Sequence, residues 1–185
     1  MRVIAGKFKS RQLKSVDSKR TRPTTDKNKE NLFNMIGPYF QGGVCLDLFA
    51  GSGGLGIEAI SRGMDELYSV DHQYRAFTTI QENVKLLKIE NQVHVYKSDY
   101  SKALFNFSTE GIRFDLVLLD PPYGMKIHQK ILDFLNQHQM LNDGCVIVIE
   151  DLKEEKIEVH EPFVLKKIQN YGITMMEILE YKEKK

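Results

Sequence analysis

The chain has 185 residues, two cysteines and a nearly balanced charge of +1 at pH 7. This length suits one domain that buries a core without disulfides or a structural metal. Because no signal peptide opens the chain and no apolar run is long enough to span a membrane, we expect a reducing, cytoplasmic setting. Cys45 and Cys145 lie in apolar runs, so we expect buried thiols rather than a disulfide, a metal site or a nucleophile.

Charge is unevenly distributed along the chain. Residues 1–29 contain ten Lys or Arg against two Asp, a charge of +8, which leaves −7 for the rest of the chain. A basic segment on an acidic body indicates a polyanionic partner. The alternative is that this segment is only a solvated stretch of charge.

The first 40 residues contain two expected elements. Residues 2–14 mix short apolar pieces with basic residues and can form a small hairpin with Gly6 near its turn. A helix is expected to begin near Asp26, capped by Thr24 or Thr25, and to end at a Gly-Pro pair. Its apolar face consists of Leu32, Phe33, Met35 and Ile36.

A glycine-rich turn, residues 49–53, follows an apolar run at residues 44–48 that is typical of a buried strand. After the turn, residues 55–63 have helical spacing. Glycine lets a backbone approach a ligand closely, and a helix start offers free N–H groups, so this geometry suits a nucleotide-type cofactor. The pattern G-x-G-x-x-G is present at Gly51, Gly53 and Gly56. By itself it fits a tight turn without a ligand equally well.

Two acidic residues favour a ligand at this turn. Asp47 lies near the end of the strand, where a charge is costly to bury without partners. Asp71 closes the next apolar run, twenty residues after Gly51. A carboxylate at that place can accept hydrogen bonds from both ribose hydroxyls of a nucleoside. The spacing therefore fits an adenosine-containing ligand.

From the turn onward, strands and helices alternate. The expected strands comprise residues 67–71, 93–97, 114–119 and 145–150. The expected helices comprise residues 73–88, residues 103–107 and a segment through Ile131, Leu132 and Leu135. Residues 163–168 and 173–179 are typical of a final antiparallel hairpin, with Met175 and Met176 on its core side. The fold class is therefore predicted as α/β, with a doubly wound, mostly parallel sheet and an antiparallel edge.

Acidic residues follow four of these strands. Asp47, Asp71, Asp99 and Asp120 all lie at or near strand ends. In a doubly wound sheet the carboxyl ends of the strands meet at the edge where ligands bind. Folding alone gives little reason to place four carboxylates there.

The Asp-Pro-Pro-Tyr motif, residues 120–123, is the most specific stretch of the chain. Consecutive prolines cannot continue a central strand, so they form a stiff, extended exit from it. Oxygen atoms at that exit can accept hydrogen bonds from the exocyclic amine of a nucleobase, which orients the nitrogen lone pair, and Tyr123 offers a stacking face. The alternative is a rigid loop that carries a surface tyrosine.

Together, the glycine-rich turn and the Asp-Pro-Pro-Tyr motif resemble those of S-adenosylmethionine-dependent amino-methyltransferases. A closer resemblance covers nearly the whole chain and is to the RsmD family, bacterial methyltransferases that act on the N2 amine of a guanine in 16S ribosomal RNA. It is carried by Arg-Val-Ile-Ala-Gly at residues 2–6, Arg-Pro-Thr-Thr-Asp at 22–26, Glu-Asn-Leu-Phe-Asn at 30–34, Asp-Leu-Phe-Ala-Gly-Ser-Gly at 47–53, Leu-Gly-Ile-Glu-Ala at 55–59 and Ser-Arg-Gly at 61–63.

The resemblance implies a Rossmann-like methyltransferase fold with a seven-stranded sheet at residues 41–185. It also implies a basic RNA-binding extension, made of a hairpin and a helix, at residues 1–40. The implied cofactor is S-adenosyl-L-methionine, and the product is S-adenosyl-L-homocysteine. Its methionine part would contact the glycine-rich turn, its ribose Asp71 and its adenine edge Asp99. The whole expected cofactor-binding set is Asp47, Phe49, Ala50, Gly51, Ser52, Gly53, Asp71, Asp99, Tyr100 and Asp120.

The resemblance also assigns the substrate side. The expected catalytic set is Asp120, Pro121, Pro122 and Tyr123, with the guanine stacked on Tyr123 and its N2 protons held by Asp120 and the motif backbone. The expected RNA-binding set is Arg2, Lys7, Arg11, Lys14, Arg20, Arg22 and Thr24. The implied partner is 16S ribosomal RNA, free or within an assembling or assembled small ribosomal subunit, and a monomer is expected.

The chain departs from the family at one place. Lys27, Asn28 and Lys29 stand where the family usually carries arginines after the Thr-x-Asp of the N-terminal helix. Positive charge is partly kept, but bidentate contact to phosphate is lost. This departure concerns how the chain binds RNA and not the methyl-transfer reaction.

Three other functions share part of the pattern. A nicotinamide-dependent oxidoreductase would use the glycine-rich turn but has no need for Asp-Pro-Pro-Tyr. An amino-methyltransferase acting on another RNA base, or on adenine N6 or cytosine N4 of DNA, would share both motifs, although a DNA enzyme normally carries a larger target-recognition region. A non-catalytic RNA-binding protein of ribosome assembly could retain the inherited fold.

The histidines do not indicate a metal site. Their positions lack the spacing of metal ligands, so no metal is expected and they are interpreted as surface or edge residues. They are His72, His94, His128, His138 and His160.

Overall fold

The computed structural model describes residues 1–16 and 25–184. Its strands are β1 (Val44–Asp47), β2 (Glu66–Asp71), β3 (Val93–Lys97), β4 (Phe114–Leu119), β5 (Leu141–Leu152), β6 (Phe163–Tyr171) and β7 (Thr174–Tyr181). They form one sheet in the order β3-β2-β1-β4-β5-β7-β6. Strands β1 to β5 pair in parallel, whereas β7 runs antiparallel to β5 and β6. The predicted fold class, including the antiparallel edge, is confirmed.

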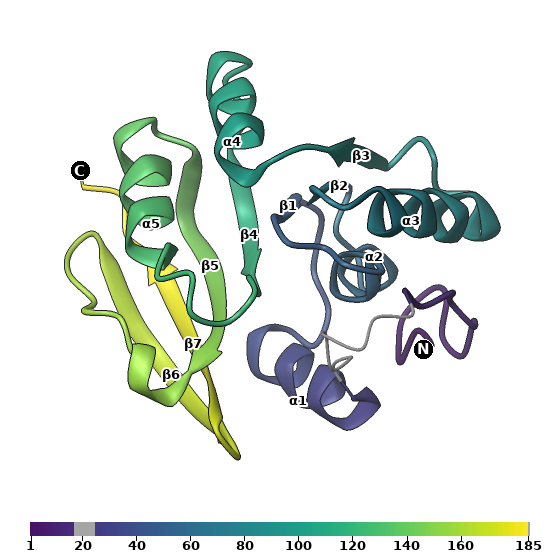
Figure 1. The fold of residues 1–185 in the computed structure, drawn as a ribbon, viewed down its shortest axis with the longest axis horizontal. Helices are drawn as coiled ribbons and strands as arrows, with labels where there is room; N and C mark the ends of the chain where they lie inside the picture. The colour runs from purple at the N-terminus through teal and green to yellow at the C-terminus, as the bar shows by residue number, and fades with distance from the viewer. Residues whose placement is uncertain (17–24, 185) are drawn as a thin grey trace.

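Helices cover both faces of this sheet (Figure 1). They are α1 (Asp26–Ile36), α2 (Gly54–Ser61), α3 (Tyr74–Leu87), α4 (Tyr100–Thr109) and α5 (His128–Gln137), with a short 3-10 helix, η1 (Lys153–Glu155). Buried side chains of α4 and α5 pack in one core cluster with Leu46 and Val117, while those of α1, α2 and α3 pack in another with Cys45 and Leu116. Because successive residues of a strand point to opposite faces, β4 needs apolar residues at nearly every position.

The N-terminal residues pack on the second of these faces. We call residues 1–16 the docked loop. Its two ends run antiparallel, with the Val3 amide donating to the Arg11 carbonyl (3.0 Å) and the Leu13 amide to the Met1 carbonyl (2.8 Å). The expected hairpin is therefore reduced to one isolated bridge between Arg2 and Gln12. Val3 and Leu13 belong to the same core cluster as the helices beneath them.

The start of α1 agrees with expectation, whereas the start of β5 does not. Thr25 is the N-cap of α1, and its hydroxyl accepts a hydrogen bond from the Asn28 amide (3.2 Å); Thr24, the other candidate cap, lies outside the described residues. Strand β5 begins at Leu141 rather than at Cys145, because Asp143 and Gly144 lie inside it, where its pairing with β4 is irregular. Both cysteines are buried and unpaired, as predicted, and Met175 and Met176 are buried.

Candidate active site

The strand order places the two sequence motifs at one edge of the sheet. From β1 the chain continues outward through β2 and β3, and from β4 it continues in the opposite direction to β5. The carboxyl ends of β1 and β4 thus form the topological switch point, where ligands bind in such sheets. The Leu48 amide donates to the Leu118 carbonyl (3.3 Å), so the two strands remain paired up to that edge. The glycine-rich turn leaves from one strand and the Asp-Pro-Pro-Tyr motif from its neighbour.

Hydrogen bonds hold the glycine-rich turn in shape. The Ala50 amide donates to the Val70 carbonyl of β2 (2.9 Å), and the Gly53 amide donates back to the Ala50 carbonyl (2.8 Å). Gly53 has φ of +81° and is the N-cap of α2. Gly51 also has positive φ, +56°, and a Cβ built on it would meet no atom of the described residues within 4 Å. The backbone at Gly51 is therefore open to a ligand.

Asp71 connects this turn to the start of α3. Its Oδ2 accepts a hydrogen bond from the Gly51 amide (2.9 Å), and its Oδ1 accepts one from the Gln73 amide (2.9 Å). A carboxylate offers about four acceptor sites, so two sites remain for the hydroxyl groups of a ribose. The Asp71 side chain is 13% exposed, so a ligand can reach these acceptor sites.

Asp99 is the N-cap of α4 and is exposed. Its Oδ1 accepts hydrogen bonds from the hydroxyl (2.6 Å) and the amide (2.8 Å) of Ser101. The hydroxyl bond is the main reason that the pKa of Asp99 lies below its usual range. Next to it, the rings of Phe49 and Tyr100 lie 5.6 Å apart between centroids, so an aromatic surface adjoins this carboxylate.

Asp47 is buried, with 3% of its surface exposed. Its Oδ2 accepts a hydrogen bond from the Gly56 amide at 3.2 Å, which ties the end of β1 to the first turn of α2. Burial raises the pKa of its carboxyl to about 7. The structure therefore places Asp47 beneath the glycine-rich turn as a support.

The Asp-Pro-Pro-Tyr motif combines a half-buried acid with an exposed ring. Asp120 is half-buried, Pro121 is buried, and Tyr123 is 50% exposed. Burial raises the pKa of Asp120 well above its usual range, and the negative charges of Glu150, Asp47 and Asp151 raise it further. The motif lies close to the end of β1, because Asp47 pairs in register with Leu118, two residues before Asp120.

The acidic end of β5 is a part of the site that the sequence analysis does not predict. Glu150 and Asp151 follow the apolar run of the fifth strand, just as the four recognised aspartates follow theirs. They could have been found by the same rule of acidic strand ends. Both act on Asp120 through their charge.

The interpretation of His128 as a surface or edge residue is wrong. It is 2% exposed, and its Nε2 lies 2.8 Å from Oδ2 of Asp151, which is 4% exposed. His128 is the first residue of α5 and faces β5, which explains its burial. Ile131 and Leu132 follow three and four residues later, so helical spacing could have placed His128 on their buried face. Of the other histidines, His72, His138 and His160 are exposed and His94 is half-buried.

Four of the basic residues predicted to bind RNA, Arg2, Lys7, Arg11 and Lys14, are described and exposed, and they already have partners. Arg2 pairs with Asp26 (2.8 Å), and Lys14 pairs with Glu82 (2.8 Å). The Arg11 guanidinium donates to the Leu86 carbonyl (3.3 Å), and the Lys7 ammonium lies 5.3 Å from the centre of the Phe8 ring. Three further members of the set, Arg20, Arg22 and Thr24, lie outside the described residues.

Lys29 cannot supply the charge that the family's arginines would. It is only 2% exposed, and its Nζ donates to the Arg2 carbonyl (2.5 Å) and lies 3.6 Å from Glu58. Lys27, by contrast, is exposed. Of the two lysines at these positions, only Lys27 is accessible to an RNA phosphate.

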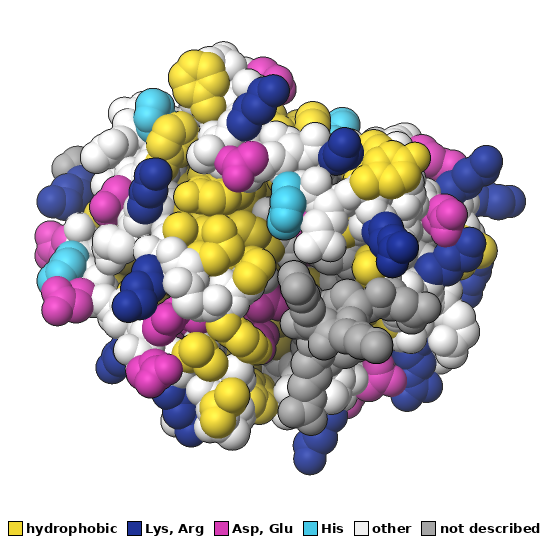
Figure 2. Space-filling model, viewed as in Figure 1, with side chains coloured by type: hydrophobic (Ala, Val, Ile, Leu, Met, Phe, Trp, Pro, Cys, Tyr) yellow, Lys and Arg dark blue, Asp and Glu magenta, His cyan; other side chains and the backbone are white. Residues whose placement is uncertain are grey.

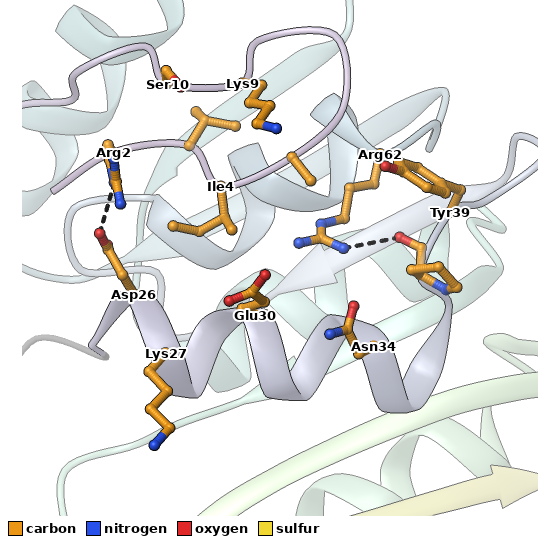
Figure 3. A pocket seen from close by; sticks show the side chains of 13 residues that line it. Arg2, Ile4, Lys9, Ser10, Asp26, Lys27, Glu30, Asn34, Tyr39 and Arg62 are labelled. Carbon is orange, nitrogen blue, oxygen red and sulfur yellow. Dashed lines mark hydrogen bonds and ion pairs between the residues drawn. The ribbon is translucent and has the colours of Figure 1, made fainter.

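A hollow of about 540 Å³ lies between the docked loop and α1. Figure 3 shows Arg2, Ile4 and Lys9 on the loop side and Glu30 and Asn34 on the helix side, with Tyr39 beside Arg62 at one end. Tyr39 is 63% exposed. The described residues that line this hollow come from the docked loop, α1, residues 38–39 and Arg62. None of them belongs to the glycine-rich turn or to the Asp-Pro-Pro-Tyr motif.

A family model described as "Conserved hypothetical protein 95" matches residues 1–180. The chain is 32% identical over 150 residues to "Ribosomal RNA small subunit methyltransferase D" of Escherichia coli strain K12, covering 81% of this chain and 74% of that protein. This chain belongs to the RsmD family.

Other relatives match this RsmD-family chain over nearly their full length. It is 44% identical to YlbH of Bacillus subtilis strain 168 over 179 residues, which is 96% of this chain and 97% of that protein. The solved structure of yhhF from Escherichia coli is similar with a TM-score of 0.87 and 27% identity, covering 98% of both chains. A conserved hypothetical protein of Streptococcus pyogenes has 36% identity and a TM-score of 0.76, covering 83% of this chain and 95% of that one.

One face of this RsmD-family chain carries a group of apolar side chains near its middle (Figure 2). On that face several Asp and Glu side chains lie beside this group, and most Lys and Arg side chains lie around the periphery. Among the described residues, none of the helices has the length and hydropathy needed to cross a membrane. Within the same residues, no group of three or more His, Cys, Asp or Glu side chains could hold a metal ion.

Proposed function

We propose that this chain transfers a methyl group from S-adenosyl-L-methionine to the exocyclic N2 amine of a guanine in 16S ribosomal RNA. One observation carries the proposal. The glycine-rich turn and the Asp-Pro-Pro-Tyr motif leave neighbouring parallel strands at the switch point of the sheet. A cofactor held by the first can therefore meet a base held by the second.

The residues at the turn fit the cofactor. Asp71 keeps acceptor sites for the two ribose hydroxyls, and Gly51 leaves its backbone open. Asp99 offers a second carboxylate beside the aromatic pair of Phe49 and Tyr100, where an adenine can pack. When bound, S-adenosyl-L-methionine supplies an activated methyl group on a positively charged sulfur. Nearby carboxylates favour such a cation because opposite charges attract strongly in a partly buried site.

The Asp-Pro-Pro-Tyr motif fits the base. The amine of guanine is a weak nucleophile, because its lone pair is delocalised into the ring. The Asp120 carboxylate and the carbonyl groups of the proline-held exit accept hydrogen bonds from the two amine N–H groups and so orient the lone pair. Tyr123 provides a stacking surface for a base that has left its helix. Holding the amine in line with the methyl group is the main catalytic contribution.

The RNA assignment draws on the relatives and on the first 40 residues. The Escherichia coli relative is named as a small-subunit ribosomal RNA methyltransferase. In this chain Arg2, Lys7, Arg11 and Lys14 are exposed on the docked loop, where they can meet phosphates. We assign the extension, residues 1–40, to RNA binding and residues 41–185 to catalysis. The substrate is free 16S ribosomal RNA or RNA in a small subunit, and the setting is the cytoplasm, with a monomer expected.

The proposal predicts a split between two aspartate variants. The experiment incubates the protein with 16S ribosomal RNA and radiolabelled S-adenosyl-L-methionine, and then identifies the labelled nucleoside as N2-methylguanosine. Asp120→Ala removes the acceptor of the amine protons, so methyl transfer is expected to fall by about 10²-fold or more. Its affinity for S-adenosyl-L-homocysteine, measured by calorimetry, should stay within a few fold of the wild type.

Asp71→Ala should give the opposite pattern, with cofactor affinity as the main loss. Normal turnover of Asp120→Ala would remove Asp120 from the mechanism. If the label is found in a different base, the methylated group is another amine and not N2 of guanine. If the wild type binds a nicotinamide cofactor and not S-adenosyl-L-homocysteine, the whole proposal fails in favour of an oxidoreductase.

A further inference from the structure

Asn83 is a buried polar residue on the apolar face of α3. It is fully buried, although the neighbouring positions of that face are filled by Ile80, Val84 and Leu87. A buried amide is costly unless its donors and acceptor find partners. The partners of Asn83 come from two segments that are far apart in the sequence.

The first segment is the docked loop. The Lys14 amide donates to Oδ1 of Asn83 (2.8 Å), and Nδ2 of Asn83 donates to the Lys14 carbonyl (2.9 Å). This pair of bonds resembles the pairing of two strands and holds the loop backbone at Lys14. The salt bridge between the side chains of Lys14 and Glu82 lies outside it, in solvent.

The second segment is the glycine-rich turn. Nδ2 of Asn83 also donates to the Ser52 carbonyl (3.0 Å), and the Ser52 hydroxyl accepts a hydrogen bond from the Val16 amide (2.8 Å). The amide plane between Ser52 and Gly53 is thereby held from both ends, because the Gly53 amide donates to Ala50. Only one orientation of the carboxamide satisfies an N–H donor and two carbonyl acceptors at once.

We infer that Asn83 is a positioning residue that couples the docked loop to the cofactor-binding turn. The inference rests on the proposed function, in which the loop meets RNA and the turn meets the cofactor. If the loop leaves, Asn83 loses two partners and Ser52 loses one; if the turn changes shape, Asn83 loses the third. Each segment therefore stabilises the other, so cofactor binding orders the loop, and RNA on the loop raises cofactor affinity by the same factor.

Amide hydrogen exchange on the full chain, with and without saturating S-adenosyl-L-homocysteine, tests this coupling. In the wild type we expect the ligand to slow exchange at Lys14 and Val16 by about tenfold, within the range typical of coupled sites. Asn83→Asp keeps the acceptor for Lys14 but has no N–H to donate to the two carbonyls. In this variant the slowing should disappear, and the Kd for S-adenosyl-L-homocysteine, measured by calorimetry, should rise about tenfold.

Gln81→Ala is the matched control, because Gln81 is exposed on the same helix and should behave as the wild type. If S-adenosyl-L-homocysteine binds but exchange at Lys14 and Val16 does not change, the coupling is wrong and the proposed function stands. If Asn83→Asp shows the full slowing, Asn83 is not the link. If the wild type binds no S-adenosyl-L-homocysteine, the proposed function fails and the coupling fails with it. The wild-type comparison decides the question even if Asn83→Asp does not fold.

Discussion

Three aspartates at one sheet edge differ because their surroundings differ. Asp71 accepts two backbone N–H groups and keeps acceptor sites for a ligand. Asp47 is buried and supports α2, with a pKa raised to about 7. Asp120 carries a pKa raised by burial and by Glu150, Asp47 and Asp151. We therefore propose that the same side chain serves binding, support and catalysis according to its partners.

Glu150 provides a test of the role of Asp120. Ionised Asp120 is the better acceptor for the amine protons, so methyl transfer should rise with pH as Asp120 loses its proton. Glu150→Gln removes the negative charge that, after burial, contributes most to raising the pKa of Asp120. The acidic limb of the pH–rate profile should therefore shift to lower pH, as measured by single-turnover methyl transfer across the acidic range.

Glu154→Gln is the control for this shift. Glu154 is an exposed carboxylate of η1, so its removal changes net charge equally without removing a cause of the Asp120 shift. Its pH profile should overlay that of the wild type. A profile for Glu150→Gln that does not move, or that moves to higher pH, would show that Asp120 does not titrate in the rate-determining step.

Among the elements, α2 has two roles. Its N-terminus follows the glycine-rich turn, and its C-terminal half receives the docked loop. The fully buried carboxylate of Glu58 accepts the Ile4 and Ala5 amides (2.9 and 3.0 Å) and pairs with Arg62 (2.9 Å). The Ser61 carbonyl accepts the Lys7 amide (2.8 Å). Helix α2 is therefore the platform that holds the loop in place.

Gly6 makes the close contact between the loop and α2. Its φ is +85°, and a Cβ there would lie 1.9 Å from the Ser61 carbonyl oxygen. Gly6→Ala should therefore lower the free energy of unfolding by about 2 kcal/mol or more, because backbone strain adds to a clash with fixed backbone. Urea denaturation measures this change.

Gly172→Ala separates the two causes. Gly172 also has positive φ, +61°, but a Cβ there would meet no atom of the described residues within 4 Å. Gly172→Ala should lower the free energy of unfolding by only about 1 kcal/mol, the strain of an alanine in the left-handed region. Equal losses for the two variants would mean that the loop does not pack on α2 as described.

For the whole molecule, we expect the separation of charge to direct how RNA approaches. Residues 1–29 carry +8 and the rest of the chain −7. The acidic sheet edge suits a cationic cofactor, whereas an RNA backbone needs the basic residues of the docked loop. Because Lys29 is buried and Arg2 and Lys14 have acidic partners, Lys7 and Arg11 are the best placed of the described set to meet phosphates.

Replacing Lys7 and Arg11 with Gln should weaken RNA binding and its dependence on salt. Each lost phosphate contact should reduce the slope of log affinity against log salt by about 0.7 to 0.9. Filter binding of 16S ribosomal RNA over a range of salt concentrations measures the slope. The control replaces Lys130 and Lys167, exposed residues of α5 and β6, and should leave it unchanged. An unchanged slope for the first pair would move the RNA site elsewhere.

Much of the fold could be predicted because its signals are local. Strands β3 and β4 were placed at their observed bounds, and the start of α1 at its capping threonine, because alternation, apolar runs and caps act over a few residues. The irregular start of β5 could not be predicted, since it depends on how that strand pairs with β4. The docked loop was only partly anticipated, because its backbone forms hydrogen bonds to α2 and α3 as well as between its own two ends.

The candidate site likewise has parts that the sequence predicts and parts that it does not. Residue types in order along the chain were enough to select the glycine-rich turn, Asp71 and the Asp-Pro-Pro-Tyr motif, because the chemistry of each is carried by its own few residues. Only the tertiary structure could show that His128 is buried against Asp151, that Glu150 acts on Asp120, and that Asn83 joins the docked loop to the turn. These relations depend on groups that are distant in sequence and meet only when the sheet and its helices pack together.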